Sequence, residues 1–252
     1  MGGLARVLTN PISSLFLPAT CRICQQPMES MSRVPICQSC WQAVRPYQGA
    51  ECALCGLFLE RAALLHGTAL CGLCRRGAFG FEQARSFASY DGPLRQILIQ
   101  FKYHGLRPLA KPLGAWLAQA AVRFDAGALD LVLPVPLYRR RERHRGFNQA
   151  ALLAAQLGKL RGIPVGGRDC VRVRDTRPQT GLRGAERRKN VKGAFVVPHP
   201  GRVRGRSVLL VDDVLTTGAT ADACARALKD AGASGVWVLT LARARAVSQD
   251  VI

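Results

Sequence analysis

Residues Val208–Thr220 read VLLVDDVLTTGAT and set the architecture that we expect for most of the chain. The stretch begins with apolar residues, passes through two aspartates and ends in a Thr-Thr-Gly-Ala-Thr turn that leads into a helical pattern. A short apolar run before a glycine turn is typical of a strand buried on both faces of a parallel sheet. The turn would then lie at the carboxyl end of that sheet, where doubly wound α/β folds bind ligands.

The turn after this strand has the composition of a phosphate-binding site. Consecutive backbone N–H groups and the positive end of the following helix favour an anion there, and Gly218 lets the backbone approach it closely. Asp212 and Asp213 would repel the anion unless they bind something else, such as the vicinal hydroxyls of a sugar. We therefore predict a phosphorylated-sugar site formed by Asp212, Asp213, Thr216, Thr217, Gly218, Ala219 and Thr220.

Strand and helix patterns alternate through the rest of the chain after Gly77. Strands separated by helices of ten or more residues predict an α/β fold, a parallel sheet flanked by helices. The expected strands are 84–90, 130–135, 165–173, 195–197, 208–211 and 236–241, and the expected helices are 93–103, 109–124, 147–162 and 220–231.

A cysteine-rich segment precedes this α/β part. Eight of the ten cysteines form four CxxC pairs, with twelve residues between the first two pairs and fifteen between the last two. This spacing allows two pairs to complete a closed tetrahedral site, so we predict two structural Zn²⁺ sites. Their ligands are Cys21, Cys24, Cys37, Cys40, Cys52, Cys55, Cys71 and Cys74. Cys170 and Cys224 are expected as small core residues.

The cysteine-rich segment has few large apolar residues, so its core alone would not fold it. Structural zinc contributes on the order of 10 kcal/mol in isolated finger peptides. Disulfides are the alternative, but cytosolic thiols stay reduced. Grouping neighbouring pairs keeps each loop short and is the arrangement that we favour, although a cross-braced grouping also fits. We expect a leader at 1–20, a double zinc-ribbon domain at 21–76 and the α/β domain at 77–252.

The charge balance indicates an anionic partner. Thirty-six Lys and Arg residues against sixteen Asp and Glu residues give a net charge of +20, which favours nucleic acid or a phosphorylated ligand. No apolar run reaches the eighteen residues of a membrane span, and Pro11 and Pro18 interrupt the leader. We therefore expect a soluble, cytoplasmic protein.

The stretch Val208–Thr220 resembles the signature of type I phosphoribosyltransferases, which bind phosphoribosyl pyrophosphate (PRPP). It has neither the GxGxxG of dinucleotide-binding folds nor the GK[ST] of a P-loop. The resemblance implies that Asp212 and Asp213 hold the ribose 2′ and 3′ hydroxyls, that Thr216–Thr220 hold the 5′-phosphate and that Mg²⁺ accompanies the pyrophosphate.

Three further segments extend the resemblance. They are FKYHG at Phe101–Gly105, VPLYRRRERHRGFNQA at Val135–Ala150 and RPQTGLRGAERRKNVKGAF at Arg177–Phe195. Together with the cysteine module they make the chain similar to the ComF family of competence proteins. This resemblance implies a role in DNA uptake and natural transformation, binding of PRPP and single-stranded DNA, and contact with a competence helicase or another DNA-processing protein.

Sixteen basic residues lie in Arg139–Arg145, Arg172–Lys192 and Arg202–Arg206, whereas PRPP carries about five negative charges. We expect a loop at Arg139–Arg145, with Arg139, Arg140, Arg187 and Arg188 binding PRPP through paired guanidinium contacts. The surplus would form a track for single-stranded DNA, with Tyr138 and Phe147 as platforms for base stacking. The nucleic-acid residues are Arg141, Arg143, Arg145, Phe147, Arg183, Lys189 and Lys192. A solvated charged face is the alternative.

No catalytic residue can be assigned from the sequence. His104 and His144 have no orienting partner visible in the sequence, and Ala246–Ile252 has no aromatic residue to stack on a nucleobase. Two functions therefore remain: a PRPP- and DNA-binding competence protein with weak or absent turnover, and a phosphoribosyltransferase acting on a small acceptor. A scaffold whose zinc module docks a helicase-like partner is a third.

Overall fold

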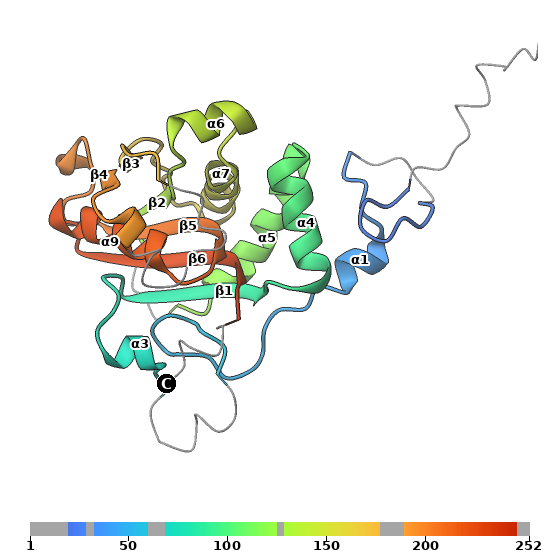
Figure 1. Ribbon diagram of the computed structural model, residues 1–252, viewed down its shortest axis with the longest axis horizontal. Coiled ribbons are helices and arrows are strands. Elements are labelled where there is room, and N and C mark those ends of the chain that lie inside the picture. Colours follow the sequence, from blue (N-terminus) through green and yellow to red (C-terminus); the bar gives the residue numbers. More distant parts are fainter. Residues whose placement is uncertain (1–19, 29–32, 60–68, 125–128, 177–188, 246–252) are drawn as a thin grey trace, which may run out of the picture.

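The computed structural model describes residues 20–28, 33–59, 69–124, 129–176 and 189–245 (Figure 1). Within these residues the centre is a four-stranded parallel sheet with the strand order β1-β6-β5-β2. The strands are β1 (Gln83–Ser89), β2 (Leu131–Pro134), β5 (Ser207–Leu215) and β6 (Gly235–Arg243). The predicted parallel sheet is therefore confirmed.

Helices cover both faces of this sheet, with α4, α5 and α7 in the core on one face and α9 in the core on the other. The helices are α1 (Gln38–Gln42), α3 (Gly72–Arg75), α4 (Gly92–Tyr103), α5 (Ala110–Ala121), α6 (Arg139–Arg145), α7 (Gln149–Arg161) and α9 (Ala219–Asp230), with 3-10 turns η2 (Arg107–Leu109) and η3 (Pro200–Arg202). Of these, α4, α5, α7 and α9 match the predicted ranges. In the parts of the chain that the structure describes, no helix has both the length and the apolar character needed to cross a bilayer.

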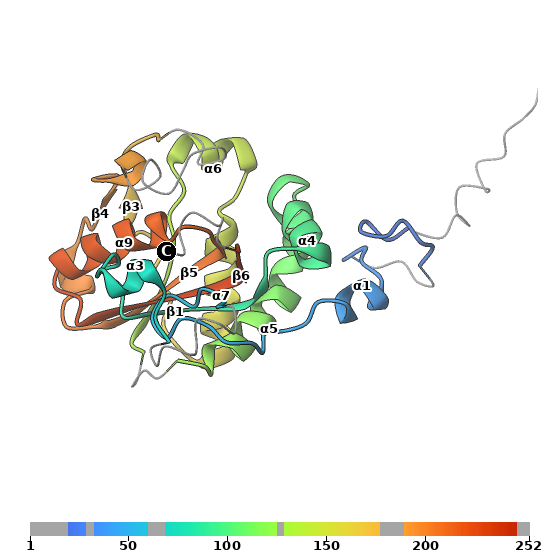
Figure 2. The ribbon, with the colours of Figure 1, turned by 60° about the horizontal axis from the view of Figure 1, so that its bottom comes forward.

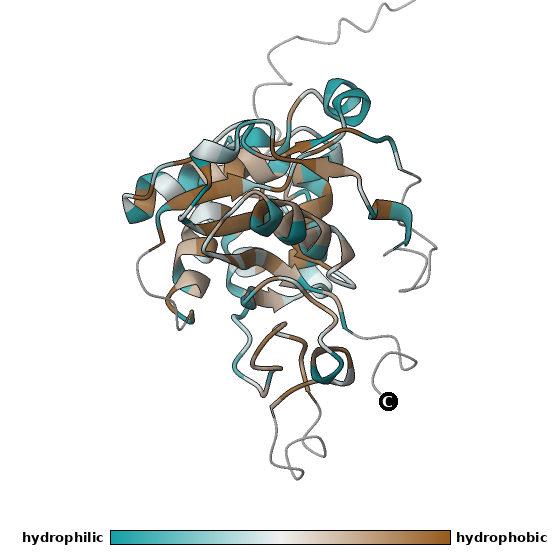
Figure 3. Cartoon of the chain, turned by 90° about the vertical axis from the view of Figure 1, so that its left-hand side faces the viewer, coloured by the Kyte–Doolittle hydropathy of each residue, from teal (hydrophilic) through white to brown (hydrophobic). Residues whose placement is uncertain are grey.

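Two apolar cores lie on opposite faces of the sheet, because successive side chains of a strand point to opposite sides. Leu209 and Val211 of β5 enter the core that contains α4, α5 and α7. Val208 and Leu210 enter the core that contains α9 and the second cysteine segment. Figure 3 shows the hydrophobic central strands enclosed by helices with hydrophilic outer surfaces. Cys170 and Cys224 are buried, as predicted.

Two predicted elements differ from the structure. The strand expected at 165–173 is reduced to β3 (Val171–Arg172), which pairs antiparallel with β4 (Phe195–Val196) in a separate small sheet. Gly166 and Gly167 interrupt the expected strand, and a Cβ at Gly166 would lie 2.4 Å from the side chain of Leu133. A run that reads as one strand therefore supplies only a parallel bridge from Val165 to Val132 and then β3.

The segment Arg139–Arg145, expected as a loop, is the helix α6. Arginine and glutamate favour helices, and Gly146 ends α6 in the left-handed conformation with φ +79°. The prediction of a loop was therefore wrong. The helix matters for function because it fixes which arginines share a face.

The two cysteine segments lie at different places on the α/β domain (Figures 1 and 2). Near α1, Trp41 packs edge-on against Trp116 of α5, with ring centroids 5.0 Å apart. The segment that leads to α3 lies against β1, where the backbone N–H of Ala84 donates to the carbonyl of Leu54 at 2.6 Å. The second segment therefore continues the hydrogen bonding of the sheet, whereas the first contacts a helix.

Candidate metal centres and ligand-binding clefts

The described cysteines form two clusters of four. In each cluster, Cys21/Cys24/Cys37/Cys40 and Cys52/Cys55/Cys71/Cys74, all four sulfur atoms lie within 4.8 Å of one another. The sulfur atoms of Cys24 and Cys37 are 3.6 Å apart, as are those of Cys55 and Cys71, close to the roughly 3.8 Å expected between thiolates on a tetrahedral zinc ion. A disulfide would need about 2 Å. The two structural zinc sites, grouped by neighbouring pairs, are confirmed.

Backbone amides orient the sulfur atoms of both clusters. The N–H groups of Ile23 and Cys37 donate to Cys21 Sγ at 3.4 and 3.3 Å, and the N–H of Cys71 donates to Cys52 Sγ at 3.3 Å. Such donors stabilise thiolates and hold them in the geometry that the metal needs. With four protein ligands and no open position, these sites are structural.

The second cluster is joined to the turn after β5 through one buried arginine. Arg243, the last residue of β6, donates from Nη1 to the carbonyl oxygens of Leu215 at 2.9 Å and of Thr216. Its Nη2 lies 3.9 Å from Cys55 Sγ. Because Arg243 is buried, the negative charge of the zinc–thiolate cluster offsets a cation that also fixes the start of the turn.

A cleft of about 500 Å³ opens beside the two aspartates at the end of β5. We call it the aspartate cleft. It is lined by Asp212, Asp213, Thr216 and the first turn of α9, and on the opposite wall by residues of α4 and α6. The cleft therefore lies at the carboxyl ends of parallel strands, as the sequence predicted.

Charges in the aspartate cleft are strongly coupled. Lys102 Nζ lies 2.8 Å from Asp213 Oδ2, and the Asp213 side chain is only 4% exposed. Burial opposes the charge of Lys102, but Asp213 and Asp212 more than offset this, so the pKa of Lys102 is raised. Burial and then the charge of Asp213 raise the pKa of Asp212 to about 8.

The turn itself brings its backbone to the cleft at Gly218. This residue has φ +79° and forms the N-cap of α9, and a Cβ there would lie 2.8 Å from the ring of Phe79. Glycine is thus required on conformational and steric grounds. Thr216, Gly218, Ala219 and Thr220 line the cleft, whereas the Thr217 hydroxyl accepts a hydrogen bond from the N–H of Ala219 at 3.5 Å.

The helix α6 separates the predicted arginines into two sets. Arg141 and Arg145, four residues apart, share one face and line the aspartate cleft. Arg139 lines a different cleft, and Arg140 is 79% exposed with its Nη1 3.8 Å from Asp175. The sequence prediction assigned Arg139 and Arg140 to PRPP, whereas Arg141 and Arg145 are the arginines of α6 that line the aspartate cleft.

Other predicted residues divide into exposed, buried and undescribed ones. Arg143, Lys189 and Lys192 are exposed. Phe147 is only 8% exposed because its ring packs on Phe101 and under the guanidinium of Arg107. The prediction of Phe147 as a stacking platform was therefore wrong. The residues that lie outside the described ranges are Arg183, Arg187 and Arg188.

Sequence reasoning missed several residues of the aspartate cleft. Lys102 follows the buried Phe101 in the last turn of α4, where nothing in the sequence marks it as facing the aspartates. Tyr90 and Arg95 also line the cleft. Arg172 was read as part of a charged segment, yet it is buried.

Comparison with known proteins defines the class first. A double zinc ribbon domain matches residues 12–75, and a phosphoribosyl transferase domain matches residues 144–250. The glutamine PRPP amidotransferase of B. subtilis covers 54% of this chain at 24% identity with a TM-score of 0.37, and this chain spans 26% of that protein. The two matching domain models show that the molecule joins a double zinc ribbon to a phosphoribosyltransferase-like domain.

Full-length relatives then define the family. The DNA utilization protein YhgH of Salmonella typhimurium is 33% identical over 233 residues, covering 91% of this chain and 99% of the relative. Competence protein F of Haemophilus influenzae is 32% identical over 214 residues, covering 83% and 90% respectively. The chain belongs to the ComF family, as the resemblance predicted.

Proposed function

We propose that this protein binds PRPP with Mg²⁺ in the aspartate cleft and takes part in DNA uptake by binding single-stranded DNA on the adjoining basic surface. One observation supports the binding of PRPP in this cleft. Two adjacent carboxylates and the N-terminal turn of a twelve-residue helix open into the same cleft. A pentose bearing a 5′-phosphate presents a diol and an oxyanion together, and so complements both.

In this proposal each part of PRPP meets a matching group. Asp212 and Asp213 accept hydrogen bonds from the ribose hydroxyls, and the backbone N–H groups at the start of α9 bind the 5′-phosphate. Arg141 and Arg145, on the opposite wall, bind the pyrophosphate, whose charge suits planar guanidinium donors. These two replace Arg139 and Arg140 in the role that the sequence suggested.

Magnesium fits this site through the ligand rather than through a protein cage. Mg²⁺ prefers oxygen ligands and is usually held by substrate phosphates with few protein groups. Asp213 is already paired with Lys102, so the pyrophosphate oxygens would hold most of the ion. Bound Mg²⁺ would neutralise part of the pyrophosphate charge.

The second half of the proposal rests on the relatives and on charge. The matched proteins are named for DNA utilization and competence. This chain carries a net charge of +20, and Arg140, Arg143, Lys189 and Lys192 are exposed. These cations exceed what one small ligand needs, and they suit the phosphates of a nucleic-acid strand.

A phosphoribosyltransferase is the second candidate, and one observation favours it. Tyr90 and Tyr103 line the aspartate cleft beyond the aspartates, and Tyr103 is 69% exposed. These rings supply the aromatic surface for an acceptor that the residues after the last strand do not contain. In that reaction the acceptor bonds to the anomeric carbon while the bond from that carbon to pyrophosphate breaks.

Calorimetry with PRPP and Mg²⁺ tests the proposal. We expect saturable binding to the wild type, and at least tenfold weaker binding to Asp212→Asn/Asp213→Asn because two hydrogen bonds to the ribose, each worth about 0.5–1.5 kcal/mol, are lost. Asp230→Asn removes an exposed carboxylate from the far end of α9 and is the control. Equal affinity of the double variant and the wild type would contradict PRPP binding in this cleft, whereas release of pyrophosphate with a defined acceptor would favour the transferase.

A further inference from the structure

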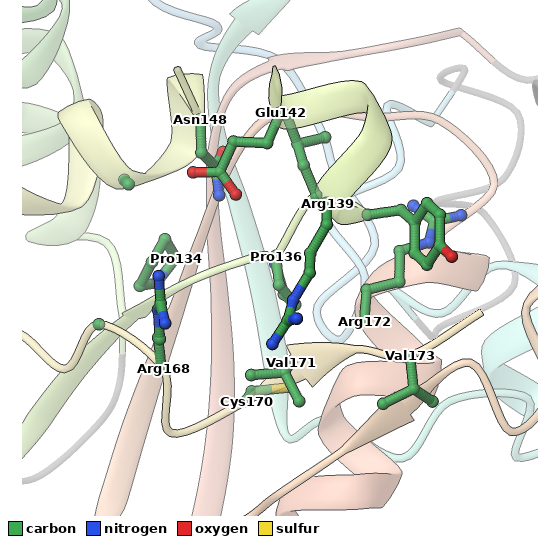
Figure 4. Close-up of a pocket in the computed structure, with 14 residues that line it drawn as sticks. Pro134, Pro136, Arg139, Glu142, Asn148, Arg168, Cys170, Val171, Arg172 and Val173 are labelled. Atoms are coloured by element: carbon green, nitrogen blue, oxygen red, sulfur yellow. The ribbon is translucent and has the colours of Figure 1, made fainter. Parts of the chain in front are cut away.

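A second cleft, of about 390 Å³, lies beside α6 (Figure 4). We call it the arginine cleft. Arg139 and Glu142 of α6 line it, whereas Arg141 and Arg145 line the aspartate cleft. Arg139, Arg168 and Arg172 line the arginine cleft together with Glu142 and the apolar side chains of Pro134 and Val171. In Figure 4 the guanidinium of Arg139 reaches down from α6 toward Val171, and that of Arg168 points toward Pro134 from the facing wall. The cleft is therefore basic on several sides and apolar between them.

Arg172 is the buried cation of this cleft. The residue is only 8% exposed, its Nη2 donates to the Thr176 hydroxyl, and its guanidinium lies 5.4 Å from the ring centroid of Phe195. Its Nε has no hydrogen-bond partner among the described residues, and no ion pair joins Arg172 to a carboxylate in the described parts of the chain.

A buried guanidinium in this state is costly for the free protein. Burial and then the neighbouring charge of Arg141 lower the pKa of Arg172, so its surroundings oppose its charge. An unsatisfied buried charged donor costs several kcal/mol unless a partner of opposite sign arrives. A donor held in place without an acceptor indicates an anionic ligand.

The other polar groups of the arginine cleft narrow the chemistry of that ligand. Asn148 uses its side chain within the fold, because Nδ2 donates to the carbonyl of Val135 at 3.1 Å and Oδ1 accepts from the N–H of Ala150 at 3.0 Å. The described lining residues include three arginines, Arg139, Arg168 and Arg172, and one carboxylate, that of Glu142. Most of the polar groups that line the cleft are guanidinium N–H donors, which suit a ligand rich in acceptor oxygens.

We propose that the arginine cleft is a second binding site that takes a phosphate ester, separate from the aspartate cleft. The guanidiniums of Arg139, Arg168 and Arg172 hold the phosphate, and the organic part of the ester lies against Pro134 and Val171. The volume falls within the range of about 300–1,000 Å³ that small-molecule sites occupy. The ester comes either from a mononucleotide or from the terminal phosphate of a nucleic-acid strand.

The proposal does not rest on PRPP binding. Arg139 and Arg168 line the arginine cleft and not the aspartate cleft, whereas Arg172 lines both. A ligand in the arginine cleft would neutralise Arg172 at the wall that the two clefts share. Occupancy of one cleft should therefore change the affinity of the other.

Thymidine 5′-monophosphate is a suitable probe, because it lacks the 2′-hydroxyl that the aspartate cleft is proposed to bind. Its binding is measured by calorimetry on the full-length, zinc-loaded wild type, on Arg168→Ala and on Arg161→Ala. Arg168 and Arg161 are both exposed, so neither change threatens the fold, and Arg161 lies at the end of α7 outside the cleft. Thymidine serves as the ligand without phosphate.

We expect the monophosphate to bind the wild type and Arg161→Ala equally, to bind Arg168→Ala about tenfold or more weakly, and thymidine not to bind. Asp212→Asn/Asp213→Asn should bind the monophosphate as tightly as the wild type does. A failure of the proposed PRPP binding can therefore be distinguished from a failure of this proposal. Equal affinity of Arg168→Ala and Arg161→Ala, or equal binding of thymidine, overturns the proposal.

The source of the ester is distinguished with hexathymidylate carrying a 5′-phosphate or a 5′-hydroxyl. Stronger binding of the phosphorylated strand that Arg168→Ala abolishes supports a nucleic-acid terminus. Binding of the mononucleotide alone with the same dependence on Arg168 supports a metabolite. Either result supports a phosphate-ester site. If Arg168→Ala weakens the binding of neither the strand nor the mononucleotide, the proposal is rejected.

Discussion

Lys102 and Asp213 join α4 to the carboxyl end of β5, with Nζ and Oδ2 2.8 Å apart. The pair holds one wall of the aspartate cleft against the strand that carries both aspartates. The Asp213 side chain is only 4% exposed, and a buried carboxylate needs a nearby cation.

The first prediction concerns this ion pair. Lys102→Met leaves the buried carboxylate of Asp213 without its cation, so the free energy of unfolding should fall by about 3 kcal/mol or more. Urea denaturation measures the change, with the exposed Lys111→Met as control. The double variant Lys102→Met/Asp213→Asn should recover part of the loss, and additive losses would show that the two side chains do not interact.

The second prediction concerns Asp212 and pH. Its pKa rises from 3.8 to about 8 on folding, so between these pH values the folded protein holds a proton that the unfolded chain has released. Stability should therefore fall as pH rises from about 4 to about 8 and then level off. Asp212→Asn removes this dependence. The difference in unfolding free energy between this variant and the wild type should therefore shift in favour of the variant by about 1 kcal/mol or more from pH 4 to pH 9. Parallel thermal-melt profiles against pH would contradict it.

The third prediction concerns the two zinc clusters. Cys55→Ser weakens the cluster that supports Arg243, so the turn that begins at Leu215 should loosen and PRPP affinity should fall by about 1–3 kcal/mol. Cys24 belongs to the first cluster, near α5 and away from that turn, so Cys24→Ser should lower the stability of its own segment and leave PRPP affinity unchanged. Zinc content and PRPP calorimetry on both variants decide this, and equal effects on PRPP would refute the link through Arg243.

The fourth prediction separates the faces of α6. Arg141→Ala should weaken PRPP binding about tenfold, because Arg141 lines the aspartate cleft. Arg143→Ala should leave PRPP affinity unchanged and lower the salt dependence of single-stranded DNA binding by about one unit of log-log slope. The readout is the affinity for oligothymidylate, measured at salt concentrations from about 50 to about 300 mM. The reverse pattern would contradict the assignment of the two faces.

The sequence predicted the sheet and the twin-aspartate turn because both are local features. Apolar runs, Gly218 and the CxxC spacing each act within a few residues, and the structure has strands, a turn and cysteine clusters at those places. Ion pairs and clefts depend on segments far apart in the chain, so Lys102 and Arg172 carried no comparable signal.

The arginines of α6 show why local charge was not enough. Five arginines in seven residues indicate an anion site, but assigning them requires knowing that the segment is a helix. In a helix, Arg141 and Arg145 face one way and Arg139 the other. Phe147 is a similar case. An aromatic residue among arginines suggests a stacking platform, but its packing on Phe101, which the sequence did not indicate, buries it.

A crystal structure with PRPP and Mg²⁺ tests the central claim most directly. The account predicts the ribose hydroxyls within hydrogen-bonding distance of the Asp212 and Asp213 carboxylates, and the 5′-phosphate at the backbone N–H groups that begin α9. A sugar seated elsewhere, or a turn at Thr216–Thr220 that remains empty while PRPP is saturating, would contradict it.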